Sequence, residues 1–382
     1  MKEGWTYKKL GEVATYINGF PFKPTDWEEE GRPIIRIQNL TNSQNNFNRC
    51  SRTDIPHKYF VTRGDVLISW SATLGIFEWE LEDALLNQHI FKVVFDKIDI
   101  DKQYFKYAVL ISIAEMAKHT NGATMKHIRK GDFDNIMIPF PSLSEQQRIV
   151  SRLDAAFAHI DALKANAEKQ LSDAKALFQR ALTQAMEPKE GWEEKKLGEI
   201  AKICLGLTHT PKYQESGVPF ISVKDISSGK LTFRDTKYIS KEEFDDMPDG
   251  AKPQKGDLLF CRVGTIGKPQ ILQKDIPFGI FVSVGFLRID NIALTEYVKY
   301  WMESPLFYKQ VEDNVQGSTL KNLNTGWLKN FTLPIPPINE ISYIVSRLDE
   351  LSDNVKKLEE IQEKTIKECD ALKQAILREV FE

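Results

Sequence analysis

The segment GTIGK, residues 264–268, is the nearest approach in this sequence to a phosphate-binding loop. Such a loop holds phosphate oxygens with backbone N–H groups and requires an earlier glycine at a fixed distance from its Gly-Lys pair. That earlier glycine is missing, and the matching segment SATLG, residues 71–75, contains a single glycine. Both segments are therefore interpreted as turns and not as nucleotide sites.

The residue types that hold metals or act as nucleophiles are scattered along the chain. Six histidines and four cysteines lack the paired spacing of a metal site, and neither HExxH nor GxSxG occurs. IPPIN (335–339) is not the Asn-Pro-Pro-aromatic motif of an adenine methyltransferase, and MPDGAK (247–252) resembles a nuclease motif only weakly. The sequence thus predicts a chain without chemistry of its own. An enzyme with an unfamiliar active site stays open as a third hypothesis.

The hexapeptide IVSRLD occurs at residues 149–154 and again at residues 344–349. The segments before it also match, because GATMK and IPFP in the first copy correspond to GSTLK and LPIPP in the second. Two earlier pairs of segments match in the same order: GWTYKKLGEVA (4–14) with GWEEKKLGEIA (191–201), and RGDVLISWSATLG (63–75) with KGDLLFCRVGTIG (255–267). The chain therefore contains one design twice.

Each copy is expected to begin with a mixed α/β domain. Short β-rich runs such as GDVLISW and HIFKVVF, or GDLLFCRV and FVSVGFLRI, alternate with turn residues. Residues 102–119 and 295–311 have helical spacing and predict one packing helix per copy. A proline-bearing hinge ends each domain, with a capping box predicted at Ser142 and Glu145 and a helix cap at Asn339.

About 40 residues without proline or glycine follow each hinge, enough for a rod of roughly 60 Å. Apolar residues recur in both stretches at the heptad spacing of a coiled-coil seam, at Ile149, Leu153, Ala156, Ile160, Leu163 and Ala167 and at Ile344, Leu348, Leu351, Val355 and Leu358. The two rods would bury these stripes against each other. In this interpretation the Ile and Leu of IVSRLD lie in the seam and its Arg and Asp lie on the solvated flank, which favours helix packing over ligand binding.

The bulk composition is that of a globular protein. The 382 residues are 42% hydrophobic and 27% charged, and their length suits two domains. The sequence has neither an apolar run of membrane-spanning length nor a signal-peptide core in MKEGWTYKKLGE, so a cytoplasmic location is expected. The net charge of −3 neither supports nor excludes nucleic acid as a partner.

The order of these features resembles that of the DNA-specificity subunit of type I restriction–modification systems, and the likeness covers the whole chain. It is carried by the G-[AS]-T-x-K segment, the hinge and the long helix of each copy, and by the opening stretches Gly4 to Glu12 and Gly191 to Glu199. The residues that match are Gly122, Thr124, Pro139, Pro141, Glu145, Gln146 and Arg148, and Gly317, Thr319, Pro334, Pro336 and Glu340. One departure is Ile341, which follows Glu340 where the first copy has Gln146.

The resemblance implies an α+β fold, with two mixed α/β target-recognition domains in pseudo-twofold tandem repeat. Two long helices, packed as an antiparallel coiled coil, would separate the domains. The implied boundaries are 1–141 and 188–338 for the recognition domains and 142–187 and 339–382 for the helices. Each domain would recognise one half of a bipartite target in double-stranded DNA, while the helices set the spacer.

The resemblance also implies a non-catalytic chain that works in a multisubunit enzyme. Two methyltransferase subunits would dock on the helices, and restriction/translocase subunits would join them. S-adenosylmethionine, ATP and magnesium would then be bound by the partner subunits, with no cofactor on this chain and no contact with a membrane.

Contacts to DNA are expected from polar side chains beside predicted turns, because phosphate contacts position a protein and base-edge contacts specify sequence. The candidates are Arg36, Gln38, Asn39, Ser69, Ser71, Thr73, Lys126 and His127 in the first domain, and Lys224, Arg262, Thr265, Lys268, Lys321 and Asn322 in the second. Arginine suits guanine, and asparagine or glutamine suits adenine. The alternative for each candidate is a solvated side chain or a structural cap. The alternative for the whole chain is a coiled-coil scaffold that binds proteins, which salt-dependent DNA binding would exclude.

Overall fold

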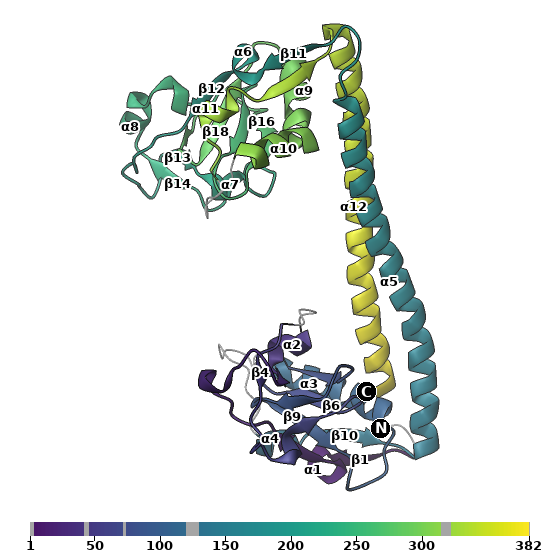
Figure 1. Cartoon of the computed structure of the whole chain (residues 1–382). Helices are drawn as coiled ribbons and strands as arrows, with labels where there is room; N and C mark the ends of the chain where they lie inside the picture. Colours follow the sequence, from purple (N-terminus) through teal and green to yellow (C-terminus); the bar gives the residue numbers. More distant parts are fainter. Residues whose placement is uncertain (1–3, 42–45, 72–73, 120–129, 315–321, 382) are drawn as a thin grey trace. The chain divides into compact units, whose positions relative to one another are not determined.

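The computed structural model describes residues 4–41, 46–71, 74–119, 130–314 and 322–381. The chain divides into two compact units, which are described one at a time: residues 1–166 with 365–382, and residues 167–364. Each unit contains one α/β domain together with part of helix α5 (Leu143–Ala185) and part of helix α12 (Ile338–Phe381) (Figure 1). The two helices have 43 and 44 residues, as the uninterrupted polar and apolar pattern predicted.

The first unit combines two sheets, a ribbon and short helices. The strand orders are β2-β9-β6-β7 and β4-β3-β8-β5, and β1 pairs with β10 in the ribbon. The strands are β1 (Thr6–Lys9), β2 (Thr15–Asn18), β3 (Arg32–Ile35), β4 (Arg49–Cys50), β5 (Phe60–Val61), β6 (Val66–Ser69), β7 (Gly75–Glu78), β8 (Ala84–Leu86), β9 (Ile90–Val94) and β10 (Met137–Phe140). The helices before α5 are α1 (Leu10–Val13), α2 (Ile37–Thr41), α3 (Lys102–His119) and α4 (Lys130–Asp134).

The second unit repeats this arrangement, with strand orders β12-β18-β15-β16 and β14-β13-β17 and the ribbon β11-β19. Its strands are β11 (Glu193–Lys196), β12 (Lys202–Leu205), β13 (Val218–Ile221), β14 (Lys237–Ile239), β15 (Leu258–Cys261), β16 (Gly267–Ile271), β17 (Gly279–Ile280), β18 (Val284–Arg288) and β19 (Thr332–Ile335). Its helices before α12 are α6 (Leu197–Ile200), α7 (Val223–Ile226), α8 (Lys241–Asp246), α9 (Ile292–Glu303), α10 (Pro305–Asn314) and α11 (Thr325–Leu328). The predicted helix at 295–311 is thus two helices, because Pro305 disfavours helical backbone at Ser304 before it.

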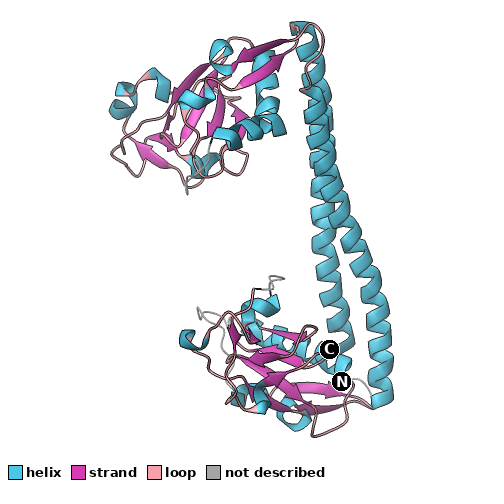
Figure 2. Cartoon of the chain, viewed as in Figure 1, coloured by secondary structure: helices cyan, strands magenta, loops and turns pink. Residues whose placement is uncertain are grey.

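Each domain has layers of helix and sheet, as Figure 2 shows by secondary structure. The buried apolar side chains of each unit form three clusters. Side chains of a strand alternate between the two faces of its sheet. Val66 and Ile68 of β6 face the core that α3 shares with the long helices, whereas Leu67 faces the second sheet. Strand β15 divides its side chains in the same way in the second unit. The near-continuous apolar run of GDVLISW and GDLLFCRV is therefore explained by burial on both faces.

The aspartate of the Gly-Asp pair at the start of each run stabilises the preceding turn and forms an ion pair. Asp65 accepts a hydrogen bond from the backbone N–H of Thr62 (2.7 Å) and pairs with Lys92 at 2.7 Å. Asp257 accepts one from Gln254 N–H (2.8 Å) and receives two bonds from the Arg288 guanidinium, at 2.7 and 2.9 Å. In each unit the aspartate thereby joins the turn before a central strand to the neighbouring strand.

Within each unit the segments of α5 and α12 pack antiparallel. In the first unit Asp161 pairs with Lys373 and Lys164 with Asp370, so numbers rise along one helix as they fall along the other. Buried apolar side chains line this contact, namely Ile149, Leu153, Phe157 and Ile160 with Cys369 and Leu377 in the first unit and Leu182 and Met186 with Ile344 and Leu348 in the second. The packing of the two helices predicted from the heptads, and the antiparallel direction implied by the resemblance, are confirmed.

Two predictions about the helices are wrong. Leu163 is 54% exposed, because an α-helix has 3.6 residues per turn and the seam shifts to Phe157 and Lys164. Asn339 does not cap α12, which already begins at Ile338. The capping box predicted at Ser142 and Glu145 is confirmed in its first half only, since Ser142 Oγ accepts from Glu145 N–H at 3.4 Å, while the Glu145 carboxylate binds Arg148. Among the residues described, no helix combines the length and apolar character that a membrane crossing requires.

Candidate nucleic-acid interface

One edge of the sheets in the first unit gathers four loops. Strands β2 and β6 end where β9 begins, because Asn18 lies opposite Phe91 and Ser69 lies opposite Ile90. Strands β3 and β8 are parallel, with Ile35 opposite Leu86, so the chain after each strand emerges at neighbouring positions. We call residues 18–20, 36–41, 69–71 and 87–89 the first loop edge.

Backbone hydrogen bonds join these four loops into one surface. Phe20 N–H donates to Leu86 O (2.8 Å), Asn87 N–H to Ile35 O (3.2 Å) and Trp70 N–H to His89 O (3.2 Å). Gly19 lies so close to this network that a Cβ atom would sit 2.0 Å from Asn87 O, so only glycine fits. The loops are therefore held rigidly at the sheet edge, as a surface for recognition requires.

The predicted residues of the first unit divide between exposed and structural positions. Gln38 is exposed on α2. Arg36 is half-buried, with Nη1 donating to Asn48 Oδ1 (3.0 Å) and its guanidinium 5.1 Å from the centre of the Trp27 ring. Asn39 is a structural cap, because its Oδ1 accepts from Arg36 N–H at 3.0 Å. Ser69 and Ser71 are buried, at 0% and 6% exposure. Thr73, Lys126 and His127, and Lys321 of the second copy, lie outside the described residues, as do Gly122, Thr124, Gly317 and Thr319.

The second unit has an equivalent edge, built from residues 205–207, 222–225, 261–266, 281–283 and 322–323, which we call the second loop edge. Cys261 lies opposite both Val284 and Gly267, and parallel strands β13 and β17 place Ile221 opposite Ile280. Leu207 N–H donates to Ile280 O at 2.9 Å, and a Cβ atom on Gly206 would lie 2.2 Å from the same oxygen. The second loop edge therefore has the same backbone arrangement as the first.

Arg262 is buried inside the second loop edge and binds backbone carbonyls there. It is 8% exposed, and its Nε and Nη1 donate to Leu323 O (3.0 Å) and Val282 O (2.8 Å). Burial lowers the pKa of this guanidinium. Its two donors fasten the segment after β15 to neighbouring loops, which makes Arg262 a structural residue in this geometry.

Three other predicted residues of the second loop edge are exposed. Thr265 and Asn322 are exposed, and Asn322 bridges to Val263. Lys224 is exposed on α7, with its Nζ donating to Asp235 O at 2.6 Å. Lys268 is exposed too, but it lines a cleft with Lys299 and Glu303 and does not join this group. The second loop edge thus has Lys224, Thr265 and Asn322 as exposed side chains, while Arg262 is buried within it.

Three residues of the first loop edge were not predicted. The Trp70 indole N–H donates to Asn18 Oδ1 at 3.1 Å, and its ring lies 5.0 Å from that of His89. His89 has a φ of 73°, a left-handed backbone that is uncommon outside glycine. Trp70 ends the run GDVLISW and His89 begins the run HIFKVVF, and this position at the end of a β-rich run is the signal that could have found them. Within the part of the chain that the structure describes, no group of three or more His, Cys, Asp or Glu side chains is placed to hold a metal ion.

Comparison with known proteins gives one consistent result. The family model of the type I restriction modification DNA specificity domain matches residues 2–172 and 189–368. The EcoBI specificity subunit of Escherichia coli is 26% identical over 99% of this chain and 86% of its own length. The MjaVIII specificity subunit of Methanocaldococcus jannaschii is 23% identical over 98% of this chain and 91% of its own.

Solved structures share the fold. A chain from a structure of complex assembly and conformational transition in the type I R-M system has a TM-score of 0.75 at 21% identity, covering 99% of this chain and 97% of that one. The HsdS subunit from Thermoanaerobacter tengcongensis has a TM-score of 0.53 at 20% identity, covering 100% and 97%.

Proposed function

This chain belongs to the family of type I restriction–modification DNA specificity subunits, and we propose that its two loop edges are the surfaces that contact the two halves of a split DNA target. Membership of the family assigns the chain DNA-sequence specificity and leaves the chemistry to other subunits. The proposal concerns which surfaces and side chains carry that specificity.

One observation carries the proposal: the two loop edges share the same backbone arrangement but have different exposed side chains. Asn39 and Asp225 occupy the same position after equivalent strands, and each accepts a backbone N–H, from Arg36 at 3.0 Å and from Ser222 at 2.8 Å. One residue earlier the exposed side chain is Gln38 in the first unit and Lys224 in the second. A repeated frame with different side chains suits a target with two different halves.

The side-chain chemistry fits groove contacts. An exposed glutamine such as Gln38 can hold the N6 and N7 edge of adenine with two hydrogen bonds. Lys224 can contact a phosphate or a guanine edge. Both lie on rigid elements at a sheet edge, which keeps their geometry fixed on binding.

The test is to co-express the chain with its methyltransferase partner and map every methylated adenine in the host DNA. We expect one split motif, and exchange of residues 1–141 for the matching domain of a relative should change one half of it only. Scattered methylation by an intact complex would overturn the proposal and favour the coiled-coil scaffold.

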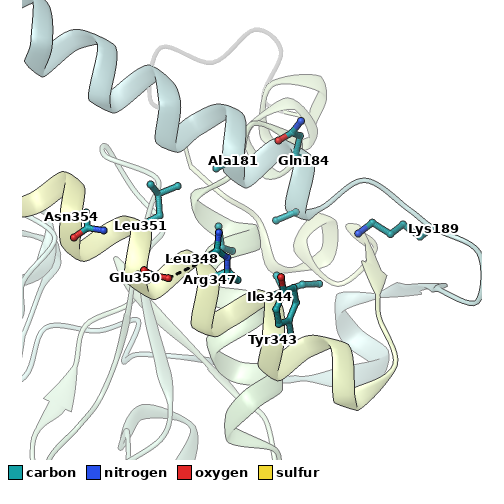
Figure 3. Close-up of a pocket in the computed structure, with 11 residues that line it drawn as sticks. Ala181, Gln184, Lys189, Tyr343, Ile344, Arg347, Leu348, Glu350, Leu351 and Asn354 are labelled. Carbon is teal, nitrogen blue, oxygen red and sulfur yellow. Dashed lines mark hydrogen bonds and ion pairs between the residues drawn. The ribbon is translucent and has the colours of Figure 1, made fainter.

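We propose that the methyltransferase subunits dock on the long helices. In the second unit a groove of about 440 Å³ lies between the end of α5 and the start of α12, lined by Ala181, Ala185, Tyr343 and Leu351 among others (Figure 3). Tyr343 is 68% exposed. Exposed apolar side chains also occur elsewhere on these helices, at Leu163, Leu177, Ile361 and Leu372. Exposed apolar surface of this kind marks contact sites for protein partners.

We propose that S-adenosylmethionine, ATP and magnesium are bound by partner subunits, among them restriction/translocase subunits. The relatives are named as specificity subunits of type I restriction enzymes. We assign the spacing between half-sites to the continuous helices α5 and α12. A helix of 43 residues extends about 65 Å at its usual rise, which exceeds one duplex turn of roughly 34 Å.

A further inference from the structure

A pair of tyrosines recurs at the same place in both units. Tyr104 and Tyr107 lie on α3, and Tyr297 and Tyr300 lie on α9. Residues three apart lie on one face of a helix, so each pair points the same way. The face in question is packed against the hinge and the long helix.

The first tyrosine of each pair binds the hinge. Tyr104 OH donates to Pro139 O at 2.8 Å, and Tyr297 OH donates to Pro334 O at 2.7 Å. Both tyrosines have no exposed surface. Each prolyl carbonyl belongs to the strand that directly precedes a long helix, so this bond fixes the point where the domain meets that helix.

The second tyrosine binds the long helix itself. Tyr107 OH donates to Asp154 Oδ1 at 2.6 Å, and Tyr300 OH donates to Asp349 Oδ1 at 2.5 Å. These aspartates are the last residues of the two IVSRLD copies. The predicted solvated flank is confirmed, because both aspartates are exposed, and the structure adds a tyrosine partner that the pattern did not reveal.

The tyrosine–aspartate bonds lie at the margin of the apolar core and not inside it. In the second unit Tyr300 and Asp349 line a cleft of about 880 Å³ between the domain and α12, with Glu296 and Lys356 among its walls. The hydrogen bond therefore joins the two elements at the border of an open space. In the first unit the Tyr107 ring also meets Phe157 of α5 edge-on, with centroids 5.5 Å apart.

The phenols remain donors at neutral pH. Burial, with the adjacent Asp154, raises the pKa of Tyr107 to about 12. Burial, with Asp349, raises the pKa of Tyr300 as well. Hydrogen bonds to a carboxylate are roughly twice as strong as neutral ones, so both contacts are suited to hold an orientation.

We propose that the bonds Tyr107–Asp154 and Tyr300–Asp349 are positioning contacts that set the angle of each recognition domain on its long helix. The bond at the hinge fixes one point of the domain on the helix, and the second bond fixes another about three helical turns further along, so the two bonds give a direction to the contact that the shared apolar core makes. The angle in turn sets where each loop edge meets the DNA. This inference rests on the proposed function.

The experiment measures how strictly the complex with the methyltransferase requires its spacer. Methylation rates are compared on the native split target and on targets with the spacer longer or shorter by one base pair. Tyr107→Phe and Tyr300→Phe should each lower the ratio of native to altered spacer by roughly fivefold or more, as expected for loss of a bond to a charged group.

Two further variants separate positioning from stability. Asp154→Ala should match Tyr107→Phe, whereas Asp154→Asn keeps an acceptor oxygen and should restore most of the ratio. Tyr16→Phe is the matched control, because Tyr16 OH donates to Leu10 O (3.1 Å) inside the same domain and not to a long helix. It should lower the thermal stability and leave the spacer ratio unchanged.

The possible failures are distinguishable. A wild-type complex that methylates without any split motif or spacer preference would refute the proposed function. A wild type with a strict spacer, and Tyr→Phe variants with the same ratio as wild type, would refute the positioning role alone. A Tyr16→Phe variant that relaxes the spacer equally would reduce the effect to general destabilisation and also overturn it.

Discussion

The side-chain oxygen of Gln146 accepts a hydrogen bond from the backbone N–H of Asp101 at 2.9 Å, inside the first unit. Gln146 is fully buried, and its Nε2 donates to Pro141 O at 3.0 Å. One amide thus joins the start of α3 to the hinge. The second unit has buried Ile341 at this position. Each helix has its own side-chain cap, since Tyr104 N–H donates to Asp101 Oδ1 at 2.8 Å in α3 and Leu294 N–H donates to Asn291 Oδ1 in α9. Gln146 therefore adds a link to the hinge in the first unit that Ile341 does not supply in the second.

We expect Gln146→Ile to destabilise the first unit by about 2 kcal/mol, because the Asp101 N–H and the Pro141 carbonyl lose their partner in a buried place. Differential scanning calorimetry of the full chain measures this change. Ile341→Gln is the reciprocal variant, and it should lower the stability of the second unit because its amide would be buried among apolar groups. A Gln146→Ile variant as stable as wild type would show that water reaches these groups.

Asp257→Ala should destabilise the protein more than Asp65→Ala. The Asp257 side chain is 4% exposed. Its removal leaves the Arg288 guanidinium without its partner, which costs about 3 kcal/mol for a buried pair. Asp65 and Lys92 are 21% and 18% exposed, so solvent compensates part of the loss. Urea unfolding followed separately for the two units compares the variants, and equal losses would contradict the prediction.

Gln38→Ala should change the preference for one base in the half-site of the first unit. Methylated-adenine mapping detects this as relaxed sequence at a single position, worth about 1–3 kcal/mol of discrimination. Lys224→Ala, at the matching position of the second unit, should weaken DNA binding and reduce the slope of log K against log salt by about 0.9 if it contacts a phosphate. Unchanged motifs and slopes in both variants would remove these residues from the interface.

Glu303→Gln should raise the stability at neutral pH. Burial raises the pKa of Glu303, and nearby Lys299 offsets only part of this effect. The stability associated with the protonated acid is therefore present below the ordinary glutamate pKa and is lost as the pH rises through the raised value. Thermal unfolding at neutral pH should show the gain, and at about pH 4 the variant and wild type should coincide. Glu363→Gln, at an exposed site, is the control and should show no gain at either pH.

Tyr343→Ser should weaken co-purification of the methyltransferase without lowering the melting temperature. Tyr343 is 68% exposed at the groove of α5 and α12, so its ring adds little to the fold. Leu153→Ala is the contrasting variant, because Leu153 is 2% exposed in the helix contact and its loss should cost about 2–4 kcal/mol. Normal assembly of Tyr343→Ser would place the partner elsewhere on the helices.

The repeat and the long helices could be predicted because repeated motifs and apolar spacing can be recognised in the sequence itself. IVSRLD, the two hinges and the apolar heptads are visible without knowing which residues meet. The seam was predicted with one error, at Leu163, because a strict heptad drifts against a helix of 3.6 residues per turn.

The candidate interface was predicted less well, because exposure depends on partners that are distant in sequence. The sequence around Arg262 does not distinguish a guanidinium that faces solvent from one that binds backbone carbonyls. Its acceptors, Val282 O and Leu323 O, are 20 and 61 positions away. The partner of Asp154 is likewise 47 positions away. Trp70 was missed because an aromatic residue at the end of a buried strand suggests core.

The ribbons β1-β10 and β11-β19 place the entrance and the exit of each domain side by side. Thr6 lies opposite Phe140, and Glu193 lies opposite Ile335. The loops between the two strands of a ribbon can be lengthened, shortened or replaced without moving the helix that follows, provided that α3 or α9 keeps its contacts with that helix. We therefore expect each domain to be exchangeable at its ribbon, so that a new half-site can be acquired while the long helices keep their sequence.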